Sequence, residues 1–132
     1  MIDGSLKQAF GVNVPEWELE KWRSSVDDQC IGQAEVAPVL WAKLTWSHVL
    51  RGRRVLFFID NDSARFALVN MYSPVDSTAS LLWRVAEADA EAVAISWYAR
   101  VPSEANLADL PSRLDFQEVL SRGFEVVEPR FS

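Results

Sequence analysis

The chain has 132 residues, which is the length of one domain. Apolar residues make up 49% and charged residues 24%, which excludes disordered, collagen-like, coiled-coil and low-complexity chains. The formal net charge is −6, from 13 basic and 19 acidic residues, and this disfavours generic nucleic-acid binding because phosphate contacts rely on clustered Lys and Arg. Two ways of binding nucleic acid stay open for an acidic chain. One is a local basic patch, and the other is an acidic site that contacts the nucleic acid through bound cations.

The sequence also bears on the cellular compartment. No apolar run approaches the roughly 20 residues of a membrane-spanning helix. The first residues lack the basic and apolar regions of a signal peptide. The single cysteine, Cys30, cannot form an internal disulfide, which fits a reducing compartment. We therefore expect an intracellular protein, cytoplasmic or nuclear, that is neither secreted nor held in a membrane.

The first 50 residues predict one strand and two helices. In chain order we expect a strand at 6–14, a short helix at 16–26, a loop at 27–29 and a long helix at 31–50. Pro38 lies inside the long helical pattern. Because a proline is tolerated in a helix only within the first turn, we expect this helix to begin at residues 33–35.

The rest of the chain alternates strands and helices. Residues 55–59 are apolar without alternation, which is typical of a strand buried on both faces. We assign Asp62 and Ser63 to capping the helix that follows. The further expected elements are a helix at 64–71, a turn at 72–76, a helix at 77–90, a strand at 93–101, a loop at 102–106, a helical turn at 107–113, a helix at 116–122 and an extended piece at 124–127.

This alternation favours an α/β fold with parallel neighbouring strands, in which ligands bind beyond the carboxyl ends of the strands. Asp60 stands just past the most apolar strand, and Glu35 and Asp109 are further acids at element boundaries. Carboxylates that fold into one cluster repel one another, and divalent Mg²⁺ or Mn²⁺ removes that penalty. Two such ions about 4 Å apart can hold both the attacking and the leaving oxygen of a phosphodiester displacement.

Three segments carry a resemblance to a known family. They are IGQAE at 31–35, VLFFIDNDSAR at 55–65 and RVPSEANLADLPSR at 100–113. In this order they resemble the ribonuclease H domain of retroelement reverse transcriptases, and the end of the last segment is the most specific piece. The resemblance implies an α/β fold in the form of a ribonuclease H-like mixed sheet flanked by helices. We expect its first strands to lie upstream of this chain.

The resemblance also implies a reaction and a site. Glu35, Asp60 and Asp109 match three of the family's four acids, which hold two Mg²⁺ (or Mn²⁺) ions for cutting RNA in an RNA–DNA hybrid. The fourth acid is either Asp3, in a stretch that resembles the family's Asp-Gly-Ser opening, or a residue upstream. Arg113 is expected either to contact a phosphate of the hybrid or to pair with a neighbouring acid.

Arg53 and Arg54 belong to the strongest basic cluster of the sequence. They are expected either to contact the hybrid backbone or to complement the end of the preceding helix. Many relatives have a histidine in the loop before the last acid, whereas the only histidine here, His48, lies in the long helix. Most of the tryptophans are expected in the core rather than as base-stacking platforms, among them Trp41, Trp46, Trp83 and Trp97.

The expected organisation is an N-terminal segment at 1–30, a ribonuclease H-like core at 31–113 and a tail at 114–132 without an assigned role. The implied partners are an RNA–DNA hybrid and the remainder of a reverse transcriptase polyprotein, with no membrane. Two alternatives stay open. One is a truncated or degenerate non-catalytic module on the same fold, and the other is a different nuclease or integrase-like member of the superfamily.

Overall fold

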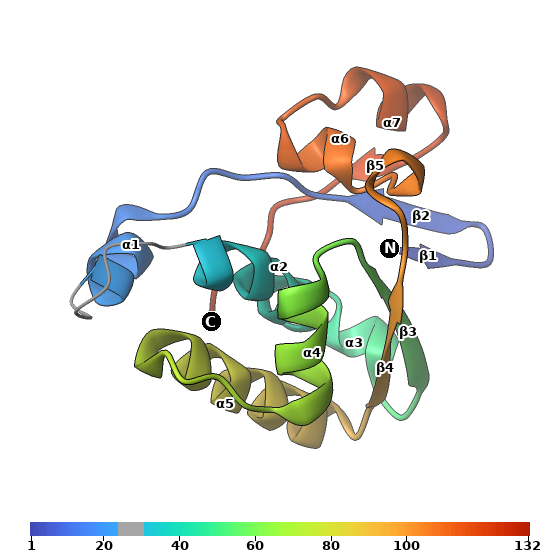
Figure 1. Ribbon diagram of the computed structural model, residues 1–132. Coiled ribbons are helices and arrows are strands. Elements are labelled where there is room, and N and C mark those ends of the chain that lie inside the picture. Colours follow the sequence, from blue (N-terminus) through green and yellow to red (C-terminus); the bar gives the residue numbers. More distant parts are fainter. Residues whose placement is uncertain (24–30) are drawn as a thin grey trace.

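The computed structural model describes residues 1–23 and 31–132. Within these residues the chain is a mixed α/β protein, as the sequence predicts, with helices packed beside two small sheets (Figure 1). The strands are β1 (Ile2–Asp3), β2 (Leu6–Ala9), β3 (Arg54–Ile59), β4 (Ile95–Arg100) and β5 (Glu125–Val126). The helices are α1 (Glu16–Arg23), α2 (Ile31–Thr45), α3 (Ser47–Leu50), α4 (Asp62–Asn70), α5 (Asp76–Ala92), α6 (Asp109–Ser112) and α7 (Gln117–Ser121), with a 3-10 turn η1 (Ser103–Ala105).

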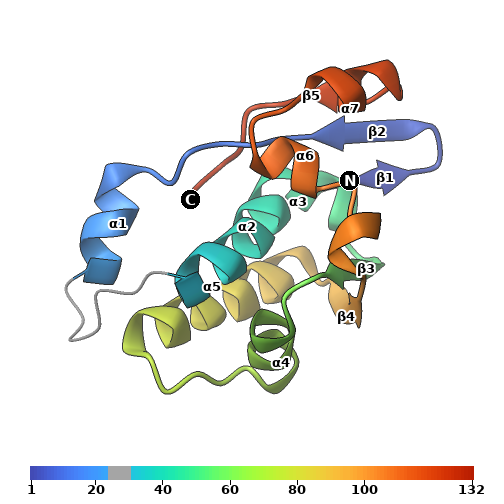
Figure 2. The same cartoon turned by 45° about the horizontal axis from the view of Figure 1, so that its top comes forward.

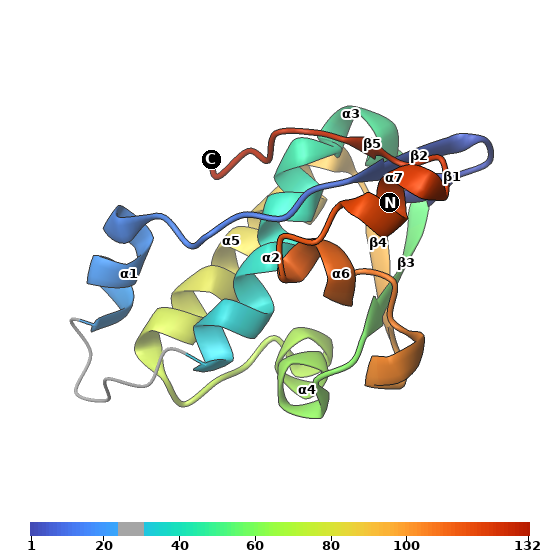
Figure 3. The ribbon, with the colours of Figure 1, turned by 90° about the horizontal axis from the view of Figure 1, so that it is seen from above.

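The β3–β4 pair positions the candidate site. The two strands are parallel, with Arg54 beside Ile95 at one end and Ile59 beside Arg100 at the other. α4 and α5 connect them, and α2, α4 and α5 lie on the same side of the pair (Figures 1 and 3). The predicted parallel pairing is therefore confirmed, and the carboxyl ends of both strands lie at one edge.

Only one face of this pair is covered. Phe57 and Tyr98 pack against the core under α2 and α5. On the other face Leu56, Phe58 and Trp97 are 56%, 58% and 64% exposed. The prediction that β3 is buried on both faces is therefore wrong. Five consecutive apolar residues carry no alternation, so the sequence cannot reveal that one face is open to solvent.

α2 lies at the centre of the core, where its Val36 and Leu40 pack with apolar residues of α4 and α5. The helix begins at Ile31, so the predicted start at residues 33–35 is wrong and Pro38 lies inside the helix. The proline ring removes one backbone donor, which leaves the carbonyl of Ala34 without its usual partner. Both Pro38 and Ala34 are exposed, so water can serve that carbonyl and the helix continues.

A buried ion pair joins α2, α5 and β4. The Lys43 ammonium lies 2.7 Å from a carboxylate oxygen of Asp89 and also donates to the hydroxyl of Ser96. It sits 4.4 Å from the centre of the Phe57 ring. The side chain of Lys43 is only 2% exposed, and this burial lowers its pKa against the opposing influence of Asp89. The positive charge of Lys43 is therefore stable in this buried position only with Asp89 beside it.

The two ends of the chain meet in the other sheet. β2 pairs with β1 in antiparallel fashion and with β5 in parallel fashion, so that Gln8 stands opposite Glu125. After β5 the chain runs back past α2 toward α1 (Figures 2 and 3). There the Phe131 ring makes edge-to-face contacts with Trp41 at 5.0 Å and with Trp17 at 6.2 Å.

An ion pair completes this attachment of α1. Arg84 of α5 lies 2.8 Å from a carboxylate oxygen of Glu18, which is buried, and donates to the main-chain oxygen of Phe131 at 2.7 Å. The tail to which the sequence assigned no role therefore holds α1 against the core.

The remaining expectations are met in part. The helix expected at 77–90 is confirmed as α5, whereas the strand expected at 6–14 is reduced to β2. α1 covers the described part of the helix expected at 16–26, while the loop at 27–29 and Cys30 lie outside the described residues. Two of the four tryptophans expected in the core, Trp83 and Trp97, are instead 69% and 64% exposed. No helix in the described part of the chain is long and apolar enough to cross a membrane.

Candidate functional site

The candidate site lies at the carboxyl end of β3. Asp60 follows the last residue of the strand and is half-buried. Asn61 comes next and caps α4, because its side-chain oxygen accepts a hydrogen bond of 2.9 Å from the backbone N–H of Ala64. The assignment of capping to Asp62 and Ser63 is therefore wrong. The cap turns the chain sharply and fixes Asp60 at the edge of the sheet.

Glu35 approaches Asp60 from α2. Partial burial of the Glu35 carboxyl raises its pKa, and the nearby negative charge of Asp60 raises it further. Glu35 lies on the exposed side of the second turn of the helix, one residue before the buried Val36. Two acids from separate elements therefore influence one another electrostatically.

Asp109 has a different partner. It is the first residue of α6, and its carboxylate lies 3.0 Å from the guanidinium of Arg113 one helical turn later. Of the alternatives for Arg113, the structure shows the pairing with Asp109. Asp109 also lines a cavity of about 420 Å³ between η1, α6 and α7, together with Asn106 and Glu118. Among the described residues, no group of three His, Cys, Asp or Glu side chains is placed to hold a metal ion.

Asp3 lies at the opposite end of β3. Its carboxylate is 2.7 Å from the guanidinium of Arg53, just before the strand begins. Arg54 is the first residue of the strand and is exposed. A strand of six residues spans about 20 Å, so Asp3 and both arginines are separated from Asp60 by the length of β3. His48, on α3, is exposed.

The Glu35–Asp60 pair fits a divalent cation in part. Two carboxylates held near one another repel, and hard cations such as Mg²⁺ prefer carboxylate oxygens. A bound cation would relieve that repulsion with these two side chains as ligands. The pair supplies two of the three protein ligands that the sequence assigns to a two-ion site.

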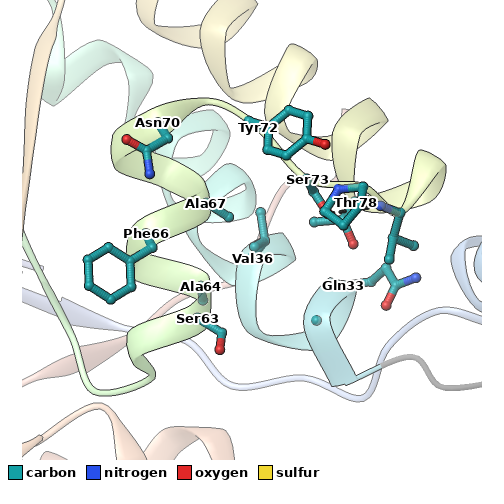
Figure 4. Close-up of a pocket in the computed structure, with 13 residues that line it drawn as sticks. Gln33, Val36, Ser63, Ala64, Phe66, Ala67, Asn70, Tyr72, Ser73 and Thr78 are labelled. Atoms are coloured by element: carbon teal, nitrogen blue, oxygen red, sulfur yellow. Dashed lines mark hydrogen bonds between the residues drawn. The ribbon is translucent and has the colours of Figure 1, made fainter.

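A second feature was missed by the sequence analysis. A pocket of about 510 Å³ opens between α2, α4 and the start of α5 (Figure 4). Its walls include Gln33, two residues before Glu35, and Ser63, three residues after Asp60. The lining residues come from two stretches of chain, 32–36 and 63–78, and form no motif, so no sequence signal marks this pocket in advance.

Comparison of the chain with protein families, with curated proteins and with solved structures finds no match. The function is therefore argued from the site itself.

Proposed function

We propose that this chain is a ribonuclease H-like domain that hydrolyses RNA in RNA–DNA hybrids with the help of Mg²⁺ or Mn²⁺. The observation that carries the proposal is the pairing of Glu35 with Asp60 at the carboxyl end of a parallel strand. This is where α/β sheets bind their ligands. The resemblance of residues 31–113 to retroelement ribonuclease H supports the same assignment. It implies an RNA–DNA hybrid and the rest of a reverse transcriptase as partners.

The chain's own residues have separable tasks. Glu35 and Asp60 would hold the cation, and the Asn61 cap fixes the turn that presents Asp60. When bound there, the cation would supply a positive field that activates water and stabilises charge on the phosphodiester. Arg54 and, on release from Asp3, Arg53 would contact the hybrid backbone at the far end of β3, about 20 Å away from the acids.

One observation favours a second candidate. Asp109 is paired with Arg113 and Asp3 with Arg53, and among the described residues no third acid is placed with Glu35 and Asp60 to hold a metal ion. A non-catalytic module on the same fold would need no complete metal site. On this alternative the chain would bind its partner without cutting it.

Cleavage of a labelled RNA–DNA hybrid by the purified protein in Mg²⁺ and in Mn²⁺ separates the two candidates. We expect cleavage that Asp60→Asn reduces by at least about 100-fold, since the change removes one charge from the cation ligands. Asp76→Asn removes the same charge from the exposed first turn of α5 and should retain full activity. Absence of cleavage, together with no heat of Mg²⁺ or Mn²⁺ binding in a calorimetric titration, would establish the non-catalytic module.

A further inference from the structure

The pocket between α2, α4 and the start of α5 is uncharged. None of the 13 residues that line it is acidic or basic. Val36 of α2, Ala64 and Ala67 of α4, and Pro74 and Val75 of the α4–α5 connection provide its apolar walls. A ligand with a formal charge inside the pocket would find no counter-charge there. The volume of about 510 Å³ lies within the range of small-molecule sites.

Two buried polar side chains face this space with unused hydrogen-bonding capacity. Gln33 is 1% exposed and its amide nitrogen donates to the hydroxyl of Ser77 at 2.6 Å, while its amide oxygen has no partner among the described residues. Thr78 is 5% exposed, and within residues 1–23 and 31–132 its hydroxyl makes no hydrogen bond. Figure 4 shows both at the same pocket. A polar ligand in the pocket could therefore form hydrogen bonds with both side chains.

The rim of the pocket is aromatic and polar. Tyr72 and Phe66 are 68% and 56% exposed, although aromatic side chains of this size usually lie inside. The amide side chain of Asn70 lies between them along the chain and is also exposed. A flat ligand that enters the pocket could therefore stack on an aromatic ring at the rim and meet amide and hydroxyl groups inside.

We infer that this pocket receives an unpaired nucleobase. A base is uncharged and planar, carries donors and acceptors on its edge, and has two faces suited to stacking. Amide side chains such as Gln33 and Asn70 match base edges with paired donor and acceptor groups. The inference rests on the proposed function, because the base would belong to the nucleic acid that the domain binds.

The test measures binding in EDTA, so it does not depend on cleavage. Two RNA–DNA hybrids are compared by fluorescence anisotropy, one with a single unpaired nucleotide and one with an abasic residue at that position. We expect the hybrid with the base to bind about tenfold more tightly, because stacking and edge contacts are lost in the other. Titration with free adenosine, guanosine, cytidine and uridine, followed by amide NMR shifts of Gln33 and Thr78, shows whether the base alone suffices.

Variants connect the preference to this pocket. Tyr72→Ala and Asn70→Ala change exposed residues of the rim, so both proteins should fold, and each should reduce the preference for the hybrid with the base. Trp83→Ala removes an aromatic side chain that is 69% exposed on α5 and does not line the pocket, and it should leave the preference intact. Tighter binding of the hybrid with the unpaired base supports the inference, whether or not free nucleosides also bind.

Equal binding of the two hybrids, with no nucleoside-induced shift at Gln33 or Thr78, would overturn it. The same holds if Tyr72→Ala and Asn70→Ala both keep the preference. A base preference in a protein that never cleaves hybrid would refute the nuclease assignment alone, whereas cleavage without a base preference would refute the pocket assignment alone.

Discussion

The carboxylates of Glu35 on α2 and Asp60 beyond β3 are electrostatically linked, because the charge on Asp60 adds to burial in raising the pKa of Glu35. In the unfolded chain Glu35 is free of both effects. The folded protein therefore binds this proton more tightly than the unfolded chain does. Protonation of Glu35 therefore stabilises the folded protein. This stabilisation is complete at a pH below the pKa of Glu35 in the unfolded chain, and it is lost as the pH rises through the pKa of Glu35 in the folded protein.

Glu35→Gln should remove this pH dependence. In buffer without divalent cations, we expect the variant and the wild type to melt at similar temperatures near pH 4, and the variant to melt at a higher temperature at pH 7. Scanning calorimetry between pH 4 and pH 8 measures the difference. Glu87→Gln, at an exposed residue of α5, serves as the control and should follow the wild type. Parallel curves for Glu35→Gln and the wild type would show that the two acids do not interact.

Asp89→Ala should be strongly destabilising because it leaves the Lys43 ammonium buried without its partner. We expect a loss of about 3–5 kcal/mol in urea unfolding. The double variant Lys43→Met and Asp89→Leu removes both charges and should recover most of that loss. Glu118→Ala breaks the Glu118–Arg122 pair, in which both side chains are about half exposed, and should cost less than about 1 kcal/mol. Equal costs for the two single variants would contradict this.

Gly11→Ala should push α6 away from the segment after β2. A methyl group at Gly11 would lie 1.7 Å from the carbonyl oxygen and 2.6 Å from the carbonyl carbon of Pro111, and backbone atoms cannot move aside cheaply. We expect a loss of about 1–3 kcal/mol in urea unfolding. At Gly32, among residues 1–23 and 31–132, the same methyl group would meet only the Thr78 hydroxyl, at 3.6 Å. Gly32→Ala should therefore be neutral or stabilise α2 by up to about 1 kcal/mol.

Phe131→Ala should loosen α1. The ring contacts Trp41 and Trp17, and aromatic pairs contribute about 0.5–1.5 kcal/mol each beyond the area that they bury. We expect a loss of about 1–3 kcal/mol in urea unfolding and a red shift of tryptophan fluorescence as water reaches Trp41. Leu120→Ala, at a residue that is 54% exposed on α7, should leave both signals close to those of the wild type. An unchanged emission spectrum in Phe131→Ala would show that the tail does not shield Trp41.

Much of the fold follows from sequence pattern. The apolar runs locate β3 and β4, three- and four-residue spacing locates α2 and α5, and alternation predicts the parallel pairing. The pattern predicted the wrong start for α2, because a proline was expected only in the first turn of a helix. Pro38 instead lies inside α2, on an exposed side where water can bind the carbonyl of Ala34 that loses its backbone partner. The pattern also could not distinguish the buried Trp41 from the exposed Trp97, since a tryptophan suits a core and an open sheet face equally well.

The acids of the candidate site could be predicted from the sequence, whereas the pocket could not. The strand-end rule singled out Asp60, and Glu35 and Asp109 were further acids at element boundaries that the resemblance also marked. Burial and the charge on Asp60 raise the pKa of Glu35. Of the two expectations for Arg113, the structure shows the pairing with Asp109 one helical turn away. The pocket escaped prediction because Gln33, Asn70 and Thr78 are neutral residues on three separate helices, and only folding brings them together.

The pairing of Gln8 with Glu125 determines when folding can finish. The strand at residues 6–9 pairs with residues 125–126, so the sheet cannot close on the ribosome before residue 126 has been translated. During that interval β1 and β2 form at most an isolated hairpin, which is marginally stable in water.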